Sequence, residues 1–219
     1  MTRVYDARVA QAPDLGFKHR YIPATDPARP PLLLLHGTGA DENDLIPLGE
    51  MLMPGAALLS PRGKVSEDGL NRFFRRIDEG VWDREDFKAR TEELATFVAE
   101  AMHTYRLERP LVLGFSNGAN IGWSLMLRDP DAFAGALLMR PMLPFDPRPF
   151  PDLTGFPVLI LSGKDDPLVP PEQPSYFAAL LGEAGADVTL EMLPAGHALT
   201  QQDLVFAHDW LERIFDPQA

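Results

Sequence analysis

The stretch Leu111 to Asn120, LVLGFSNGAN, predicts the central feature of the fold. The apolar run Leu111 to Leu113 leads into Gly114-Phe115-Ser116-Asn117-Gly118, and an apolar-patterned segment follows, which is typical of a strand, a sharp turn and a helix. Glycine on both sides of Ser116 suits a turn that strains the serine backbone and brings strand and helix close together. Such a turn lifts the serine hydroxyl out of the sheet, where it can act as a nucleophile. The alternative is a Ser/Asn/Gly turn that only caps a helix.

Composition limits what the chain can be. Its 219 residues are 45% hydrophobic, which is enough to bury a full core, and we expect one domain over residues 1–219. The net charge of −12 argues against nucleic acid and against stable membrane association, because like charges repel. The chain has no cysteine, so it has no disulfide and no thiol nucleophile. No segment reads as a signal peptide or a membrane span, and we expect a cytoplasmic protein.

The rest of the chain alternates between strand and helix patterns, and it shows no internal repeat. Strands are expected at residues 4–10, 16–22, 32–35, 56–59, 133–139, 158–161 and 188–193, the first two as a hairpin. Helices are expected at 41–53, 86–105, 174–184 and 201–215, and irregular segments at 60–86 and 140–157. This order predicts an α/β fold with a mostly parallel, doubly wound sheet, helices on both faces and no cap domain.

Four polar stretches each follow a predicted strand and should meet at the carboxyl edge of the sheet. They are residues 36–39, Ser116, Asp165-Asp166 and His197. A serine needs a base oriented by a carboxylate, and in hydrolases with this turn the chain order is serine, acid, histidine. His197 fits the base because it lies in a loop after a strand, whereas His208 falls on the apolar stripe of the last helix. Spacing leaves Asp165 and Asp166 as equal candidates for the acid.

Backbone groups near these side chains are candidates for an oxyanion hole. The N–H groups of Thr38 and Asn117 follow the ends of two predicted strands and would bind the negative charge of a tetrahedral intermediate. His36 precedes the serine, and no second ligand is spaced to join it, so we interpret it as structural. We therefore expect no metal.

Four segments together resemble the phospholipase/carboxylesterase family of α/β-hydrolases. They are His36 to Glu42, Gly114 to Gly118, Asp166 to Pro170 and Gly196-His197, and the resemblance covers nearly the whole chain. Ser60-Pro61-Arg62-Gly63 and Arg72-Phe73-Phe74-Arg75-Arg76 further resemble bacterial carboxylesterases linked to hydroquinone and catechol resistance, a branch related to acyl-protein thioesterases.

The resemblance implies roles for particular residues. In that family the acid directly precedes a Pro-[Leu/Ile]-Val run, which selects Asp166 over Asp165. The resemblance also implies Ser116 and His197 as nucleophile and base, Thr38 and Asn117 as oxyanion donors, and a mechanism without a cofactor. This chain differs from the family at one point, because it has Ser-Asn-Gly where many members carry Ser-Gln-Gly. The backbone N–H donor of Asn117 is unaffected by this difference, but the orientation of the substrate could be affected.

Aromatic residues of the two irregular segments are candidates for an apolar substrate pocket, although core packing would explain them as well. They are Phe73, Phe74, Trp82, Phe145 and Phe150. Arg75 and Arg76 could face an anionic substrate group, but a solvated surface explains them more simply.

The expected function is a serine carboxylesterase that acts on small to medium esters through an acyl-enzyme intermediate. The alternatives are a thioesterase or lysophospholipase for longer single acyl chains, and a non-catalytic ligand-binding protein on the same fold. The partner would be a small-molecule ester, and the sequence leaves open whether the chain is a monomer or a homodimer.

Overall fold

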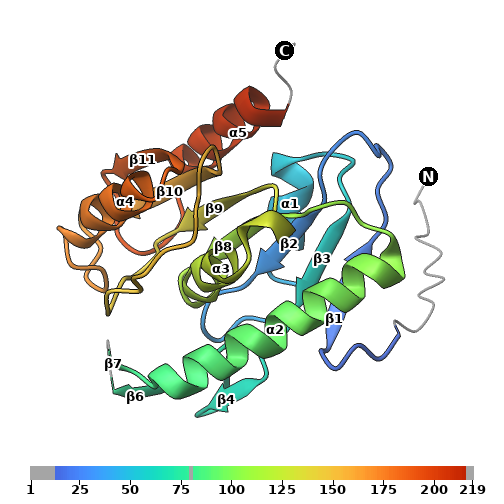
Figure 1. Cartoon of the computed structure of the whole chain (residues 1–219), viewed down its shortest axis with the longest axis horizontal. Helices are drawn as coiled ribbons and strands as arrows, with labels where there is room; N and C mark the ends of the chain where they lie inside the picture. Colours follow the sequence, from blue (N-terminus) through green and yellow to red (C-terminus); the bar gives the residue numbers. More distant parts are fainter. Residues whose placement is uncertain (1–12, 79–80, 216–219) are drawn as a thin grey trace, which may run out of the picture.

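The computed structural model describes residues 13–78 and 81–215. Its central feature is a seven-stranded sheet with the order β1-β3-β2-β8-β9-β10-β11, in which β1 is antiparallel to β3 and the other neighbours are parallel (Figure 1). Its strands are β1 (His19–Ile22), β2 (Leu32–Leu35), β3 (Leu58–Pro61), β8 (Leu111–Phe115), β9 (Gly135–Met139), β10 (Pro157–Gly163) and β11 (Asp187–Leu193). This confirms the predicted mostly parallel α/β architecture.

Five α-helices of the described residues cover the two faces of this sheet. They are α1 (Ile46–Leu52), α2 (Arg84–Tyr105), α3 (Asn117–Arg128), α4 (Gln173–Glu183) and α5 (Gln201–Phe215), and a short 3₁₀ turn, η1 (Pro130–Ala132), follows α3. Helices α2, α3 and α4 contribute to one hydrophobic core, and α1 and α5 contribute to the other. The sheet is thus enclosed on both sides, as a parallel sheet requires.

The leucine run of β2 explains why the sheet has two cores. Successive side chains of a strand point to opposite faces. Leu33 and Leu35 accordingly lie in the core shared with α2, α3 and α4, whereas Leu32 and Leu34 lie in the core shared with α1 and α5. All four side chains are fully buried, which explains why the strand is apolar at every position rather than at alternate ones.

Two expectations need correction, and a third lies outside the described residues. The strand expected at residues 4–10 falls outside the described part of the chain, and its expected partner segment contains β1, which pairs with β3. The first helix begins only at Ile46, because Pro47 occupies its first turn and residues 41–44 form a hydrogen-bonded turn. Residues 60–86 are not simply a loop: they carry the short strands β4 (Val65–Glu67), β5 (Leu70–Arg72), β6 (Arg76–Asp78) and β7 (Val81–Trp82).

The strand order changes direction between β2 and β8. From β2 the chain passes through α1 to β3 on one side, and from β8 it passes through α3 to β9 on the other. A crevice forms at such a switch point, beyond the carboxyl ends of the strands, and ligands bind there. Residues 37–38 follow β2 and Ser116 follows β8, so both lie at this crevice. Within the described ranges, no helix is long and apolar enough to cross a bilayer.

Candidate active site

Ser116 occupies the sharp turn between β8 and α3. Its backbone has φ 52° and ψ −113°, a region that L-residues rarely adopt and that is typical of strained functional positions. The flanking glycines are needed because α3 starts so close to the sheet. A Cβ on Gly118 would lie 1.9 Å from the Leu35 carbonyl oxygen, and one on Gly114 would lie 2.6 Å from the Gly118 oxygen. The Ser116 N–H donates to the Met139 carbonyl on β9, which holds the turn in place.

Ser116, His197 and Asp166 are joined by two hydrogen bonds. The Ser116 hydroxyl lies 2.8 Å from His197 Nε2, and His197 Nδ1 lies 2.8 Å from Asp166 Oδ2. Because a carboxylate only accepts, Nδ1 carries the proton, and Nε2 is left to accept from the serine. Asp166 Oδ1 also accepts from the Leu168 N–H, which fixes the carboxylate, whose side chain is fully buried. The adjacent Asp165 is exposed, so the structure distinguishes two residues that spacing could not.

Two backbone N–H groups beside Ser116 are candidates for an oxyanion hole. Thr38 and Asn117 both line the cavity at Ser116, and neither N–H donates to another described residue. Asn117 is also the first residue of α3, so the positive end of the helix dipole lies at the same place. The Asn117 side chain does not face substrate freely: its Oδ1 accepts from the Phe73 N–H at 2.7 Å. The asparagine that stands in place of the family's glutamine therefore connects α3 to the segment after β5 through its side chain.

A buried ion pair, which the sequence patterns did not reveal, supports the loop of His197. The side chains of Arg140 and Asp203 are both completely buried and form a bidentate pair with distances of 2.7 and 3.0 Å. The same guanidinium donates to the carbonyls of Gly196 and Ala198, the two neighbours of His197. One signal in the sequence could have indicated this pair: Arg140 directly follows the buried strand β9, at the edge of the sheet where the polar stretches meet.

The cavity above Ser116 has a volume of about 290 Å³. Thr38, Ser116 and Asn117 line it together with Trp82 and two arginines, Arg72 and Arg76. Its size is at the lower end of ligand pockets, which run from roughly 300 to 1,000 Å³. The cavity therefore suits a small molecule.

Of the five aromatic residues expected to line this cavity, Trp82 does so and the other four do not. Phe74 is fully buried and packs against Trp82 and Phe87, and Phe73 packs on His36. Phe150 is packed against the core on the side of α2, α3 and α4. In the sequence, a long segment whose aromatic side chains fill the core cannot be distinguished from one whose aromatic side chains line a pocket.

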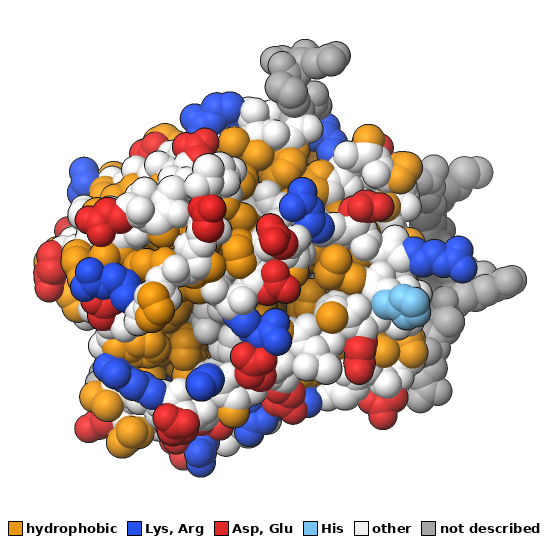
Figure 2. Space-filling model, in the orientation of Figure 1, with side chains coloured by type: hydrophobic (Ala, Val, Ile, Leu, Met, Phe, Trp, Pro, Cys, Tyr) orange, Lys and Arg blue, Asp and Glu red, His pale blue; other side chains and the backbone are white. Residues whose placement is uncertain are grey.

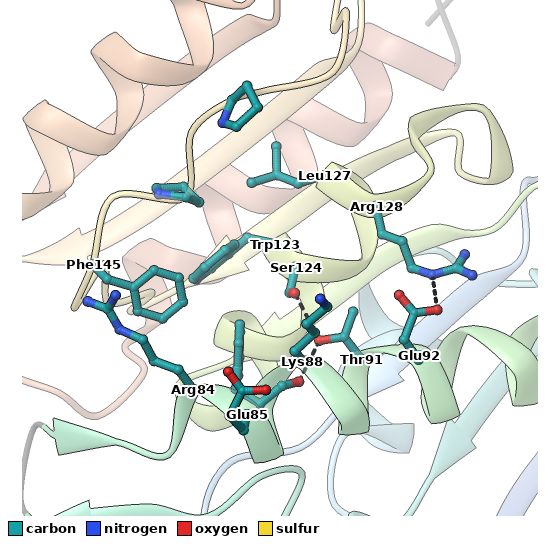
Figure 3. Close-up of a pocket in the computed structure, with 13 residues that line it drawn as sticks. Arg84, Glu85, Lys88, Thr91, Glu92, Trp123, Ser124, Leu127, Arg128 and Phe145 are labelled. Carbon is teal, nitrogen blue, oxygen red and sulfur yellow. Dashed lines mark hydrogen bonds and ion pairs between the residues drawn. The ribbon is translucent and has the colours of Figure 1, made fainter.

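Phe145 lines a different cavity, of about 370 Å³, between α2 and α3 (Figure 3). Trp123 and Phe145 face this cavity, and Trp82 packs against both, with ring centroids 6.3 and 6.0 Å away. An aromatic wall therefore separates it from the Ser116 cavity. Figure 2 shows apolar atoms in a hollow on this face, flanked by positive side chains, and Arg84 and Lys88 of α2 line the cavity.

His36 has a structural role in the fold. Its Nδ1 donates to the Gly37 carbonyl at 2.7 Å, and its Nε2 accepts from the Gly63 N–H at 3.0 Å, so both ring nitrogens are used. Burial lowers its pKa and favours the neutral form that this arrangement needs. Among the residues that the structure describes, no group of three or more His, Cys, Asp or Glu side chains is placed to hold a metal ion.

Sequence comparisons match this chain to known proteins over most of its length. The sequence model of the phospholipase/carboxylesterase family matches residues 19–215. The protein MhqD of Bacillus subtilis (strain 168) is 44% identical over 181 residues, which cover 82% of this chain and 90% of MhqD.

Two solved structures illustrate the similarity in fold. The carboxylesterase of Bacillus cereus superposes with a TM-score of 0.88 at 40% identity, covering 90% of this chain and 94% of its own. YahD, solved with malic acid, superposes with a TM-score of 0.86 at 27% identity, covering 90% of this chain and 99% of its own.

Proposed function

Since this chain belongs to the phospholipase/carboxylesterase family of hydrolases, we propose that it is a serine carboxylesterase that acts on small to medium carboxylic esters through an acyl-enzyme intermediate. The observation that carries the proposal is the hydrogen-bonded series Ser116, His197, Asp166 at the switch point of the sheet. A binding protein has no need of a serine, a base and an acid aligned in this way, which argues against the non-catalytic alternative.

The first half of the reaction forms the acyl-enzyme. Ser116 Oγ attacks the ester carbonyl carbon while His197 Nε2 takes the hydroxyl proton, and Asp166 holds the imidazole in the required tautomer and stabilises its charged form. The carbonyl oxygen becomes an oxyanion and accepts from the N–H groups of Thr38 and Asn117. When the tetrahedral intermediate collapses, the carbon–oxygen bond to the alcohol breaks, and the alcohol leaves with the proton from His197.

The second half releases the acid. Water attacks the acyl carbon, His197 takes its proton, and a second oxyanion forms at the same N–H groups. Collapse breaks the bond to Ser116 Oγ and returns the proton to it, so the free enzyme is restored. The proton transfers in both halves use the contacts of 2.8 Å that join Ser116 to His197 and His197 to Asp166.

The cavity of about 290 Å³ supports small substrates over long acyl chains. A thioesterase or lysophospholipase remains the alternative, and a profile of kcat/KM against acyl length tests it with p-nitrophenyl esters. We expect the highest values at short to medium chains. A steady rise beyond ten carbons would instead favour the alternative.

Labelling with a fluorophosphonate tests the serine mechanism directly. We expect intact-mass analysis to show one adduct on the wild-type protein and none on Ser116→Ala, together with loss of p-nitrophenyl butyrate hydrolysis. Ser124→Ala is the matched control, because Ser124 lies on α3, the helix that follows Ser116, but bonds to Thr91 and lines the other cavity. Wild-type protein that neither labels nor hydrolyses the ester would refute the proposed function.

A further inference from the structure

Arg72, on β5, places a buried positive charge in the wall of the Ser116 cavity. Only 8% of its side chain is exposed. Its Nε lies 3.4 Å from Glu67 Oε2 and donates to the Phe74 carbonyl at 3.3 Å. Its two terminal nitrogens, which carry four N–H donors, donate to no described residue, and the side chain lines the cavity that contains Ser116. The unused side of the guanidinium is therefore available to a molecule in the cavity.

Arg76, on β6, adds a second positive charge to the same wall. Its Nε lies 3.5 Å from Glu67 Oε2, the oxygen that Arg72 also approaches, and its backbone N–H donates to Glu67 Oε1. Within the described ranges, both guanidinium groups thus approach the same Glu67 carboxylate. Asp68 and Asp78 lie with Arg76 around a separate depression that Ser116 does not line. No acidic side chain of the described residues lines the Ser116 cavity, although the chain as a whole carries a net charge of −12.

The buried charge of Arg72, whose carboxylate partner Glu67 is shared with Arg76, is unfavourable without a further counter-charge. Burial lowers the pKa of Arg72, Arg76 lowers it further, and Glu67 opposes both effects. A buried charge is retained in proteins when a partner neutralises it. A carboxylate matches the two parallel N–H donors of a guanidinium, so an anionic group in the cavity would supply that partner.

Resting on the proposed esterase activity, we propose that the cavity selects esters that carry a carboxylate besides the ester group. The carboxylate binds Arg72 and Arg76 while the ester carbonyl lies against Ser116 and the N–H groups of Thr38 and Asn117. The substrates are then short monoesters of dicarboxylic acids, or esters whose alcohol part carries the acid. Both fit a cavity of about 290 Å³.

Two pairs of esters of matched size test the inference. Mono-p-nitrophenyl succinate is compared with p-nitrophenyl butyrate for an acid on the acyl side, and 4-acetoxybenzoate with 4-methylphenyl acetate for an acid on the alcohol side. Each rate is corrected for spontaneous hydrolysis. In at least one pair we expect kcat/KM of the charged ester to exceed that of the neutral ester about tenfold or more, the effect of one hydrogen-bonded charge pair.

Variants connect the preference to the arginines. In Arg72→Gln we expect the ratio of charged to neutral kcat/KM to fall about tenfold, and in Arg76→Gln to fall by less, because 43% of the Arg76 side chain is exposed. Arg75→Gln is the control: Arg75 is exposed, pairs with Asp83 and Asp86, and does not line the cavity. Should Arg72→Gln fail to fold, Arg76→Gln and the loss of the wild-type preference at high salt still test the inference.

Binding separates failure of this inference from failure of the proposed function. Calorimetry of succinate with Ser116→Ala needs no turnover, and we expect Arg72→Gln to weaken binding about tenfold in that background. Wild-type protein that hydrolyses the neutral ester of both pairs at least as well as the charged one overturns the inference and leaves the esterase intact. If the protein binds succinate but neither hydrolyses any of the esters nor is labelled by the fluorophosphonate, the arginine site is supported and the proposed esterase activity is overturned.

Discussion

The guanidinium of Arg140 and the carboxylate of Asp203 form a bidentate ion pair that no solvent reaches, directly beneath the loop of His197. The carboxylate also accepts from the N–H and hydroxyl of Thr200, both at Oδ2, so Arg140 and Thr200 together donate four hydrogen bonds to it. The remaining donors of Arg140 go to backbone carbonyls, including those on either side of His197. The pair thereby connects the end of β9, the histidine loop and the start of α5.

Replacing Asp203 with Asn should destabilise the protein and reduce its activity. The change leaves the Arg140 charge buried without a counter-charge, and breaking one partner of a buried pair costs about 3–5 kcal/mol. We expect urea unfolding to show a loss of that order. We also expect kcat to fall more than KM rises, because the loop that aims His197 at Ser116 is loosened.

Asp209→Asn is the matched control, since Asp209 lies on the same helix and is 72% exposed. It should change neither stability nor activity measurably. If Asp203→Asn matched the wild type in both measurements, the ion pair would have no role in holding the histidine loop.

Asp166→Asn should be far more damaging than Asp165→Asn. An amide at position 166 can donate to His197 Nδ1, which favours the tautomer whose Nε2 cannot accept from Ser116, and a drop in kcat of about 10⁴ is typical of this change. Asp165 is exposed, so its variant should stay within a few-fold of the wild type. Steady-state kinetics on p-nitrophenyl butyrate measures both, and a larger loss in Asp165→Asn would refute the assignment of Asp166 as the acid.

Trp82→Ala should extend the range of acyl chains. Trp82 lines the Ser116 cavity and packs against Trp123 and Phe145, which line the neighbouring cavity, so removing its ring opens a path between the two. We expect the ratio of kcat/KM for the octanoate ester to that for the butyrate ester to rise.

Trp210→Ala controls for the loss of stability, which is about 3–5 kcal/mol for truncating a buried tryptophan. Trp210 is buried on the opposite face of the sheet, with α5, so its variant should keep the wild-type chain-length preference. An unchanged preference in Trp82→Ala would mean that Trp82 does not limit chain length.

His36 should make the protein less stable in mild acid. Its pKa is lowered chiefly by burial, and Arg62 lowers it further, while the Gly37 carbonyl, Asp44 and Asp41 oppose this. The folded state thus binds the proton less readily than the unfolded chain. The stability that His36 contributes is complete above the unfolded pKa of about 6.5 and is lost as the pH falls below it.

Urea unfolding across a pH series measures this dependence. We expect His36→Gln to reduce the slope of unfolding free energy against pH below about pH 6.5, by up to about 1.4 kcal/mol per pH unit for the single proton removed. His103→Gln, at an exposed position of α2, should leave the slope unchanged. A wild-type slope retained by His36→Gln would show that other groups cause the acid sensitivity.

Local patterns in the sequence were sufficient for the fold and for most of the residues at the candidate site. Continuous apolar runs such as that of β2 indicate strands buried on both faces, and their alternation with amphipathic segments predicts a parallel, doubly wound sheet. Gly114, Ser116 and Gly118 mark the turn because only small residues fit between β8 and α3. The position of His197 after the last strand followed from the same logic.

Tertiary structure decided which partner each side chain contacts at the carboxyl edge of the sheet. Spacing left Asp165 and Asp166 as equal candidates, but the backbone turn after β10 buries Asp166 against His197 and leaves Asp165 in solvent. Arg140 and Asp203 are 63 positions apart, and no local period relates them. Whether an aromatic residue lines the cavity or fills the core, as with Trp82 and Phe74, depends on how the segment after β3 packs on α2 and α3. Spacing along the chain predicts which edge of the sheet a side chain reaches, whereas its partner there is set by packing between elements that are distant in sequence.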